Sequence, residues 1–459
     1  MRLDCVVRGG TITTVEASVV ADIGIKDGRI AAIARDLNAE HVVDATGMLV
    51  VPGAIDVHTH FANDVGGVAT ADDYESGSRA AAVGGITSFV NFAFQLPGRT
   101  LVESVEAELR KADGHSYLDF GLHVAITDPQ AVQMATELAE LAERGITSVK
   151  IFTAVERFQL ARREMLLVMD AASSAGMMVN VHAEDGALVD YQTKRLLRRG
   201  DRSVQFLSEA RPVEAEALAT AMVSTYAAMV GCAVYFVHLS CRAALDAVRR
   251  ARQEGNQVYV ETRPAYLFLD NRRYELPDFE GNKYVCWPPL RSADDQIALW
   301  EGLRNGEIQT YATDHTTWTA AQKMDPGLDF HEIPGGVSNV QTSIGMLFAE
   351  GVQRGRISMS RFVEVTATNP AKLFGMWPQK GTLAVGADAD LVLIDPTKEA
   401  HIRGSEMESR SDFDPYDGWK GVGWPVLTMS RGEVVVRDGK VVAACGRGRP
   451  IHRERYQCL

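Results

Sequence analysis

Short apolar segments alternate with amphipathic stretches through the middle of this 459-residue chain. They recur about every 30 to 40 residues, and their β-branched and aromatic content favours strands. Eight strand–helix units match a (β/α)₈ barrel better than an open doubly wound sheet. We therefore expect the α/β class, with functional residues at the C-terminal ends of the strands. The strand candidates are residues 54–60, 86–92, 118–125, 147–152, 177–182, 233–238, 257–262 and 309–313.

Both ends of the chain have the pattern of β-hairpins. Asp27-Gly28 separates two apolar segments near the N-terminus, and Asp438-Gly439 does the same near the C-terminus. Asp-Gly pairs favour tight hairpin turns because glycine accepts positive φ. We expect the termini to form one small discontinuous β-sandwich domain, residues 1–52 and 378–459, beside a TIM-like barrel of residues 53–377. Two separate β appendages are the alternative.

Composition narrows the class of protein. The net charge is −13, and no basic stretch opposes it, which argues against nucleic acid and anionic membranes as partners. No segment approaches the run of about 18 apolar residues that a membrane helix requires. The N-terminus lacks a basic and then apolar leader, so a cytoplasmic location is expected. Six scattered cysteines fit reduced thiols rather than a disulfide framework.

Metal-binding side chains gather at the ends of the strand candidates. His58 and His60 are two residues apart on one strand, so their imidazoles point to the same side. One rim of the barrel would collect six such groups, which random core histidines would not do: His58, His60, Lys150, His182, His238 and Asp314.

Four imidazoles and a carboxylate are more ligands than one zinc ion uses, so two divalent ions are the simpler interpretation. Such a pair would share a bridging hydroxide and lower its pKa, giving a nucleophile at neutral pH. A cationic Lys150 beside two dications would be strongly disfavoured. It must therefore be neutral, outside the site or chemically converted to an anion, and the residues alone do not choose among these.

Several motifs occur in an order that resembles the amidohydrolase superfamily, and most closely its dihydropyrimidinase and D-hydantoinase family. The likeness covers nearly the whole chain. The motifs are Pro52-Gly53-Ala54-Ile55-Asp56-Val57-His58-Thr59-His60, Val149-Lys150-Ile151-Phe152, His182-Ala183-Glu184-Asp185-Gly186, Val237-His238-Leu239-Ser240, Thr313-Asp314-His315, Pro288-Pro289-Leu290-Arg291 and Asn369-Pro370-Ala371-Lys372-Leu373-Phe374-Gly375.

This resemblance implies roles for the six groups. His58 and His60 would hold one metal, and His182 and His238 the other. Lys150, carboxylated by CO₂, would bridge both ions as a carbamate. Asp314 would ligate the first metal and move a proton as general base and then acid. The family's usual metal is zinc. Its usual reaction is hydrolytic opening of a hydantoin, dihydropyrimidine or related cyclic amide, and the enzymes are usually homotetramers.

Three positions depart from the family pattern and bear on the substrate. The family has a tyrosine at position 155, whose hydroxyl holds the developing oxyanion; this chain has Val155. Trp287 replaces a serine, although the family uses mainly main-chain groups there, and Gly335 replaces an asparagine. We expect a reshaped, more apolar pocket. Thr153, Arg157 and Trp318 are candidate replacement donors, and Trp318 could also line the pocket with Trp287 and Phe152.

Two kinds of alternative function remain: another hydrolase that uses the same metal centre, and a protein without catalytic activity. An allantoinase-like or dihydroorotase-like enzyme, or a hydrolase of cyclic imides or carbamates, would use the same metal centre on a small-molecule substrate. A non-catalytic dihydropyrimidinase-like scaffold is less favoured because all six ligand candidates are present. Of the other histidines, His123 is expected to be a satisfied core residue, and His315 either orients the site or is a neighbour without a role.

Overall fold

The computed structural model describes residues 2–65, 68–130 and 133–459. Eight parallel strands form a sheet in which each strand pairs with the next along the chain, and β15 and β6 are its two ends. A bridge between Thr59 and His315 brings these ends together, so the barrel is nearly closed. The strands are β6 (Ala54–Thr59), β9 (Ile86–Phe94), β10 (Asp119–Ala125), β11 (Ser148–Phe152), β12 (Met178–His182), β13 (Val234–Phe236), β14 (Val258–Thr262) and β15 (Thr310–Tyr311).

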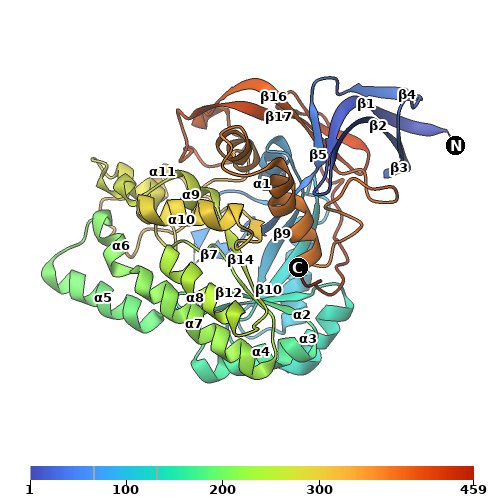
Figure 1. Cartoon of the computed structure of the whole chain (residues 1–459). Coiled ribbons are helices and arrows are strands. Elements are labelled where there is room, and N and C mark those ends of the chain that lie inside the picture. The colour runs from blue at the N-terminus through green and yellow to red at the C-terminus, as the bar shows by residue number, and fades with distance from the viewer. Residues whose placement is uncertain (1, 66–67, 131–132) are drawn as a thin grey trace.

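Helices surround these strands, and all eight strand candidates are confirmed (Figure 1). The barrel strands are buried along almost their whole length, which explains why they read as continuous apolar runs. The main helices are α1 (Tyr74–Val83), α2 (Leu101–Ala112), α3 (Met134–Glu143), α4 (Arg162–Ser174), α5 (Gly186–Arg199), α7 (Val213–Val230), α8 (Arg242–Gln253) and α10 (Ala293–Arg304). Within the described ranges, every helix is too short or too polar to cross a bilayer.

Local sequence sets where these helices begin. Thr100 caps α2: its hydroxyl accepts from the Glu103 amide, and the Glu103 carboxylate accepts from the Thr100 amide, both at 3.0 Å. Asp185 caps α5 by accepting from the Leu188 amide at 2.9 Å. Because Asp185 follows β12 by three residues, this cap also fixes the loop that leaves the His182 end of the strand.

The two termini join in a separate mixed sheet, as the hairpin pattern predicts. Blue N-terminal and orange-red C-terminal strands lie together at the top of Figure 1, where β5 pairs with β16. Both Asp-Gly pairs adopt positive φ at each residue, as a tight hairpin turn requires. The strands are β1 (Leu3–Thr13), β2 (Ser18–Lys26), β3 (Arg29–Ala34), β4 (Ala39–Asp44), β5 (Leu49–Pro52), β16 (Leu391–His401), β17 (Lys420–Ser430), β18 (Glu433–Arg437) and β19 (Lys440–Val441).

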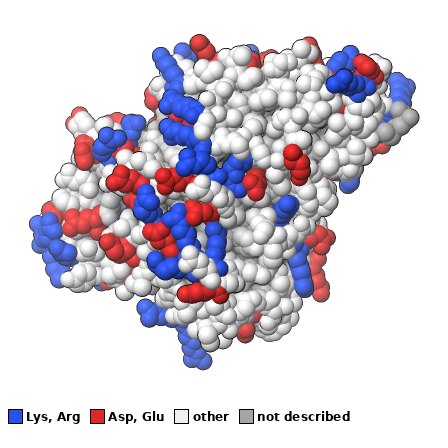
Figure 2. Space-filling model, in the orientation of Figure 1, with Lys and Arg blue, Asp and Glu red and all other residues white. Residues whose placement is uncertain are grey.

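The expected fold class is therefore confirmed: a nearly closed parallel barrel with a separate mixed sheet. The division of the chain at residues 52 and 378 stays a prediction. The last residues return to the barrel, where the Phe120 amide donates to the Arg449 carbonyl and the Arg453 side chain is buried. On the face shown in Figure 2, Lys and Arg groups lie next to Asp and Glu groups mainly toward the left and centre of the view.

Candidate metal centre

One cavity at the C-terminal rim of the barrel is lined by all six groups that the sequence singled out. His58 lies on β6 and His60 just beyond it, while Lys150 and His182 come from β11 and β12. His238 follows β13, and Asp314 follows β15. Their convergence follows from parallel strands ending at one rim.

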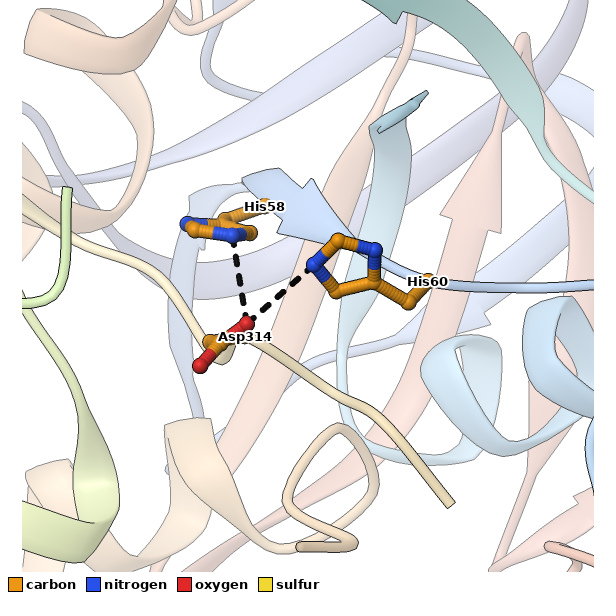
Figure 3. Close-up of side chains that lie close together, drawn as sticks. All are labelled: His58, His60 and Asp314. Atoms are coloured by element: carbon orange, nitrogen blue, oxygen red, sulfur yellow. Dashed lines mark ion pairs between the residues drawn. The ribbon is translucent and has the colours of Figure 1, made fainter. Parts of the chain in front are cut away.

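The first group of donors is His58, His60 and Asp314 (Figure 3). Asp314 Oδ1 lies 3.1 Å from His58 Nε2 and 3.3 Å from His60 Nε2. The three donor atoms all lie within 4.8 Å of one another. Imidazole nitrogens with a carboxylate oxygen form a set that suits a divalent ion of the zinc type.

The second group is His182 and His238. His182 Nδ1 and His238 Nε2 face each other at 3.0 Å. Burial lowers the pKa of both imidazoles, and also that of His60, so these rings are neutral at pH 7. Neutral imidazole is the form that binds metal, so the donor set fits divalent ions.

Hydrogen bonds on the far side of three rings fix which nitrogen points inward. Glu261 Oε1 bonds to His58 Nδ1, Asn63 Oδ1 to His60 Nδ1 at 3.2 Å, and Glu184 Oε2 to His182 Nε2 at 2.8 Å. Such partners orient ligands and make them more basic. These three partners are not among the site residues that the sequence predicts. Glu184 stood in a quoted motif, but nothing in the sequence showed that Asn63 or Glu261 reaches a ring.

Lys150 is the sixth group, and its side chain is buried. Burial lowers the pKa of its amine to about 7, although Glu261 and Asp314 oppose this shift. Its Nζ lies 5.4 Å from the Phe92 ring centroid and 5.2 Å from that of Phe152. A large share of the amine is therefore neutral at pH 7.

Backbone strain accompanies the site. Asp314, His238 and Val155 have φ of 50°, 43° and 72°. Residues other than glycine rarely adopt this left-handed region of backbone conformation. A β-branched residue such as Val155 is an outlier there, at a cost on the order of 1–3 kcal/mol. Two of the three residues are ligand candidates, so the fold maintains unfavourable backbone geometry where the donors must point inward.

The rest of the cavity is largely aromatic and aliphatic. Phe158 lies 5.3 Å from both Phe94 and Phe152 by ring centroids, and Val155 packs on this cluster. On another side, Trp287 packs against Gly335, where an added Cβ would lie 2.8 Å from the indole Cδ2. All three departures from the family pattern therefore line the cavity.

The structure corrects the expected replacement donors. Thr153 Oγ1 already donates to the His182 and Glu184 carbonyls, and Arg157 is exposed outside the cavity lining. Trp318 is buried, does not line the cavity, and donates through Nε1 to the Gly335 carbonyl at 2.9 Å. None of the three offers a free hydrogen to a substrate in this conformation.

The two remaining histidine expectations are settled by contacts. His123 is buried, with Nε2 bonded to the Val57 carbonyl at 2.9 Å and Nδ1 to Ser148, as a satisfied core residue should be. His315 is not a ligand candidate, because its Nε2 bonds to Asp72 at 2.9 Å and its Nδ1 accepts from the Asn339 amide. Its ring therefore joins the segment after β15 to Asp72 and Asn339.

Comparisons with known proteins agree with this geometry. The profile of the amidohydrolase family matches residues 49–435. A D-hydantoinase from Geobacillus stearothermophilus is 40% identical over 99% of this chain and 97% of its own length, and one from Ralstonia pickettii is 40% identical over 99% and 100%. The crystal structure of a dihydropyrimidinase from Brevibacillus agri has a TM-score of 0.96 at 38% identity and covers 98% of this chain and 99% of its own.

Proposed function

The chain belongs to the amidohydrolase family and is a metal-dependent hydrolase of cyclic amides, and we propose that two divalent ions, zinc by family resemblance, occupy its barrel rim. The observation that carries the proposal is the convergence of two donor groups in one buried cavity. The proposed ligands are His58, His60, Lys150, His182, His238 and Asp314.

Bound at these residues, the metals would supply an activated water and would polarise the amide carbonyl. We propose that Lys150 bridges them as a carbamate. A neutral amine adds to CO₂ and loses a proton to give an anion with two oxygens, and the low pKa of Lys150 supplies the neutral amine. This conversion resolves the conflict between a lysine cation and two dications.

Asp314 is the proposed general base and acid. It belongs to the first donor group and lines the cavity, and its carboxylate is ionised because Arg263 and two imidazoles outweigh the effect of burial on its pKa. It would take a proton from the attacking water as the new C–O bond forms. It would return that proton to the ring nitrogen as the C–N bond breaks, so that this nitrogen leaves as a neutral group.

The lining favours a neutral substrate with an apolar substituent. Among the described residues that line the cavity, Lys150 is the only lysine or arginine, so a carboxylate on the ring would find no cationic side chain beyond the metal centre. This disfavours dihydroorotate among the alternatives. Val155 lacks the family's hydroxyl, whose loss typically costs about 10²–10³ in turnover. We therefore propose a bulky or activated cyclic amide or imide rather than dihydrouracil.

A panel of cyclic substrates tests both the assignment as an enzyme and the proposed substrate preference. Metal-loaded enzyme would be assayed with hydantoin, aryl- and alkyl-substituted hydantoins, dihydrouracil, allantoin, dihydroorotate, cyclic imides and cyclic carbamates. We expect the highest kcat/KM for a ring with an apolar substituent, and Val155→Tyr should improve turnover of dihydrouracil. No ring opening at all would contradict the enzyme assignment and favour the scaffold. Dihydrouracil as the best substrate, with no gain from Val155→Tyr, would contradict the substrate proposal alone.

We also propose a homotetramer, by family resemblance. Apolar side chains on the terminal sheet support self-association, since Val19 and Val20 of β2 are 50% and 54% exposed. Light scattering across a concentration series would measure the assembly, and a monomer at micromolar concentration would contradict it.

A further inference from the structure

Arg263 is a fully buried cation behind the barrel rim, one residue beyond β14. It does not line the cavity. Its Nη1 donates to Asp314 Oδ2, and its Nη2 donates to the Tyr266 hydroxyl at 2.8 Å and approaches the Pro288 carbonyl at 3.4 Å. The guanidinium also lies over the Tyr266 ring, 4.4 Å from its centroid. A cation this deep requires such partners, because an unpaired buried charge is very costly.

Because of the contact with Arg263, the two carboxylate oxygens of Asp314 have different partners. Oδ1 faces His58 and His60, where the first ion would bind, while Oδ2 is held by the guanidinium. A carboxylate held at both ends cannot rotate about its Cβ–Cγ bond. The Arg263 contact leaves Oδ2 with a second lone pair for a proton, since a carboxylate oxygen accepts two hydrogen bonds.

The other side of the guanidinium contacts the segment that contains Trp287 and Pro288, which forms part of the cavity wall. The Tyr266 hydroxyl donates to the Pro288 carbonyl at 2.7 Å, and Arg263 Nη2 approaches the same oxygen. Pro288 directly follows Trp287, which lines the cavity. One planar side chain therefore connects the proposed proton carrier to the segment that bounds the substrate. A lysine has a single nitrogen and could not hold both in a fixed relation.

We propose that Arg263 is a positioning residue that fixes the Asp314 carboxylate relative to the Trp287–Pro288 segment, so that proton delivery to the leaving nitrogen is aligned with the bound ring. The inference rests on the proposed function. It predicts a specific pattern in the kinetics. Loss of Arg263 should lower kcat most for substrates whose leaving nitrogen depends most on being protonated. If Arg263 had a purely structural role, its loss would lower kcat by the same factor for all substrates.

The kinetic test compares leaving groups and uses a matched variant. Arg263→Met removes both contacts, Arg263→Lys keeps the charge but not the fork, and Tyr266→Phe removes only the hydroxyl that holds Pro288. Misplacement of a catalytic group by about 1 Å can cost about 10²-fold, so we expect a fall of that order in kcat for Arg263→Met on an unactivated cyclic amide. An activated cyclic imide should lose several-fold less. Tyr266→Phe should raise KM, with the same effect on both substrates.

Each rate is normalised to bound metal, so that metal loss is not counted as lost alignment. Arg263→Lys should show the same leaving-group dependence as Arg263→Met but a smaller loss, and it serves if the methionine variant does not fold. Equal losses on the amide and the imide for both Arg263 variants would overturn the inference. A wild-type enzyme that opens no ring would overturn the proposed function instead.

A second readout needs no activity. In metal-free protein, Arg263→Met and Asp314→Asn should each lower the melting temperature, and the double variant should melt no lower than the less stable single variant, because both changes remove the same contact. Tyr266→Phe combined with Asp314→Asn should instead give additive shifts. Additive shifts for Arg263→Met and Asp314→Asn would show that the two side chains are not coupled, and would overturn the inference whatever the substrate.

Discussion

At the scale of single residues, Trp287 and Gly335 depend on each other. The indole packs so closely on Gly335 that a Cβ there would lie 2.8 Å from Cδ2 and 3.1 Å from Cε2. Real Cβ contacts are not this short, so a larger residue at 335 would have to displace the ring. The absence of a side chain at position 335 is therefore what leaves room for the Trp287 ring in the cavity wall.

Gly335→Ala should therefore impair the enzyme through Trp287. Overpacking costs roughly 1–3 kcal/mol, which corresponds to about 5- to 150-fold in KM for the best substrate when the whole cost falls on binding. The same change made in a Trp287→Ser background should be nearly neutral, since the ring is gone. Steady-state kinetics on the two single variants and the double variant measure the coupling. Equal effects of Gly335→Ala in both backgrounds would contradict the dependence.

Lys150 carries a second prediction at this scale. Lys150→Ala should lose most bound metal and turnover, because Asp314, the other oxygen donor that the proposal places among the described lining residues, is already engaged with the first donor group and with Arg263. Short carboxylic acids added with metal should restore part of the rate by taking the place of the carbamate. Metal content and turnover are measured together. A variant that retains two ions and full turnover would rule out the bridging role.

Sequence was sufficient for the inward-facing groups but not for their supports. His58, His60, Lys150, His182, His238 and Asp314 follow from strand ends alone, because parallel strands in a barrel share one rim. Glu261 and Arg263 act through contacts between distant segments, and no spacing rule links them to a ring or a carboxylate. Asn63 is only three residues from His60, but no pattern in the sequence shows that its side chain turns back to that ring. Side-chain orientation also decided that Thr153 and Trp318 are not free donors.

At the scale of elements, the segment 402–419 between β16 and β17 extends from the terminal sheet to the barrel. The Asp72 carboxylate accepts from Ser409 Oγ and the Arg410 amide on this segment, and also bonds to His315. The Tyr416 hydroxyl donates to Asn339 Oδ1 at 2.6 Å. The sequence analysis placed this stretch with the terminal β domain. Its contacts with the barrel are long-range and left no periodic pattern to detect.

Asp414 makes this segment sensitive to pH. Burial raises the pKa of its carboxyl to about 7, with a smaller contribution from Asp417, while the hydrogen bond from the Tyr416 amide opposes the shift. Its unfolded value is about 3.9. A folded pKa above the unfolded one means that the folded protein binds the proton more tightly. Its contribution to stability is therefore complete below about pH 4 and is lost as pH rises to about 7.

Asp414→Asn should remove this penalty while keeping an acceptor for the Tyr416 amide. The free energy of unfolding should then exceed that of the wild type by on the order of 4 kcal/mol at pH 8, and the difference should shrink toward pH 4. Urea denaturation at several pH values measures it. Asp113→Asn, an equal change of charge at an exposed position, is the control and should be near neutral. A pH-independent difference would show that Asp414 is not protonated in the folded protein.

At the scale of the whole molecule, one buried lysine joins the terminal sheet to the barrel. Lys380 Nζ lies 3.0 Å from Asp119 Oδ2 on β10, 3.0 Å from Asp388 Oδ2 and 2.8 Å from Asp390 Oδ2. All four side chains are nearly inaccessible. Lys380 and Asp119 are 261 residues apart in the sequence, so no local pattern predicts the contact between the two sheets.

Lys380→Met should therefore destabilise the whole molecule, because it leaves three buried carboxylates with one nearby cation, Arg431 at 3.2 Å from Asp119. Breaking a buried ion pair from one side costs about 3–5 kcal/mol, against at most about 1 kcal/mol for Lys194→Met at an exposed pair on α5.

Burial already raises the pKa of Asp390, and Lys380 opposes that rise. Without the lysine this pKa moves further above the unfolded value, so the carboxyl takes up a proton on folding. The stability deficit should thus be largest at pH 7 and above and should shrink as pH falls toward 4. Urea denaturation at pH 5 and pH 8 measures this difference, and an equal deficit at both would show that lost packing of the lysine stem, rather than unpaired charge, is the cause.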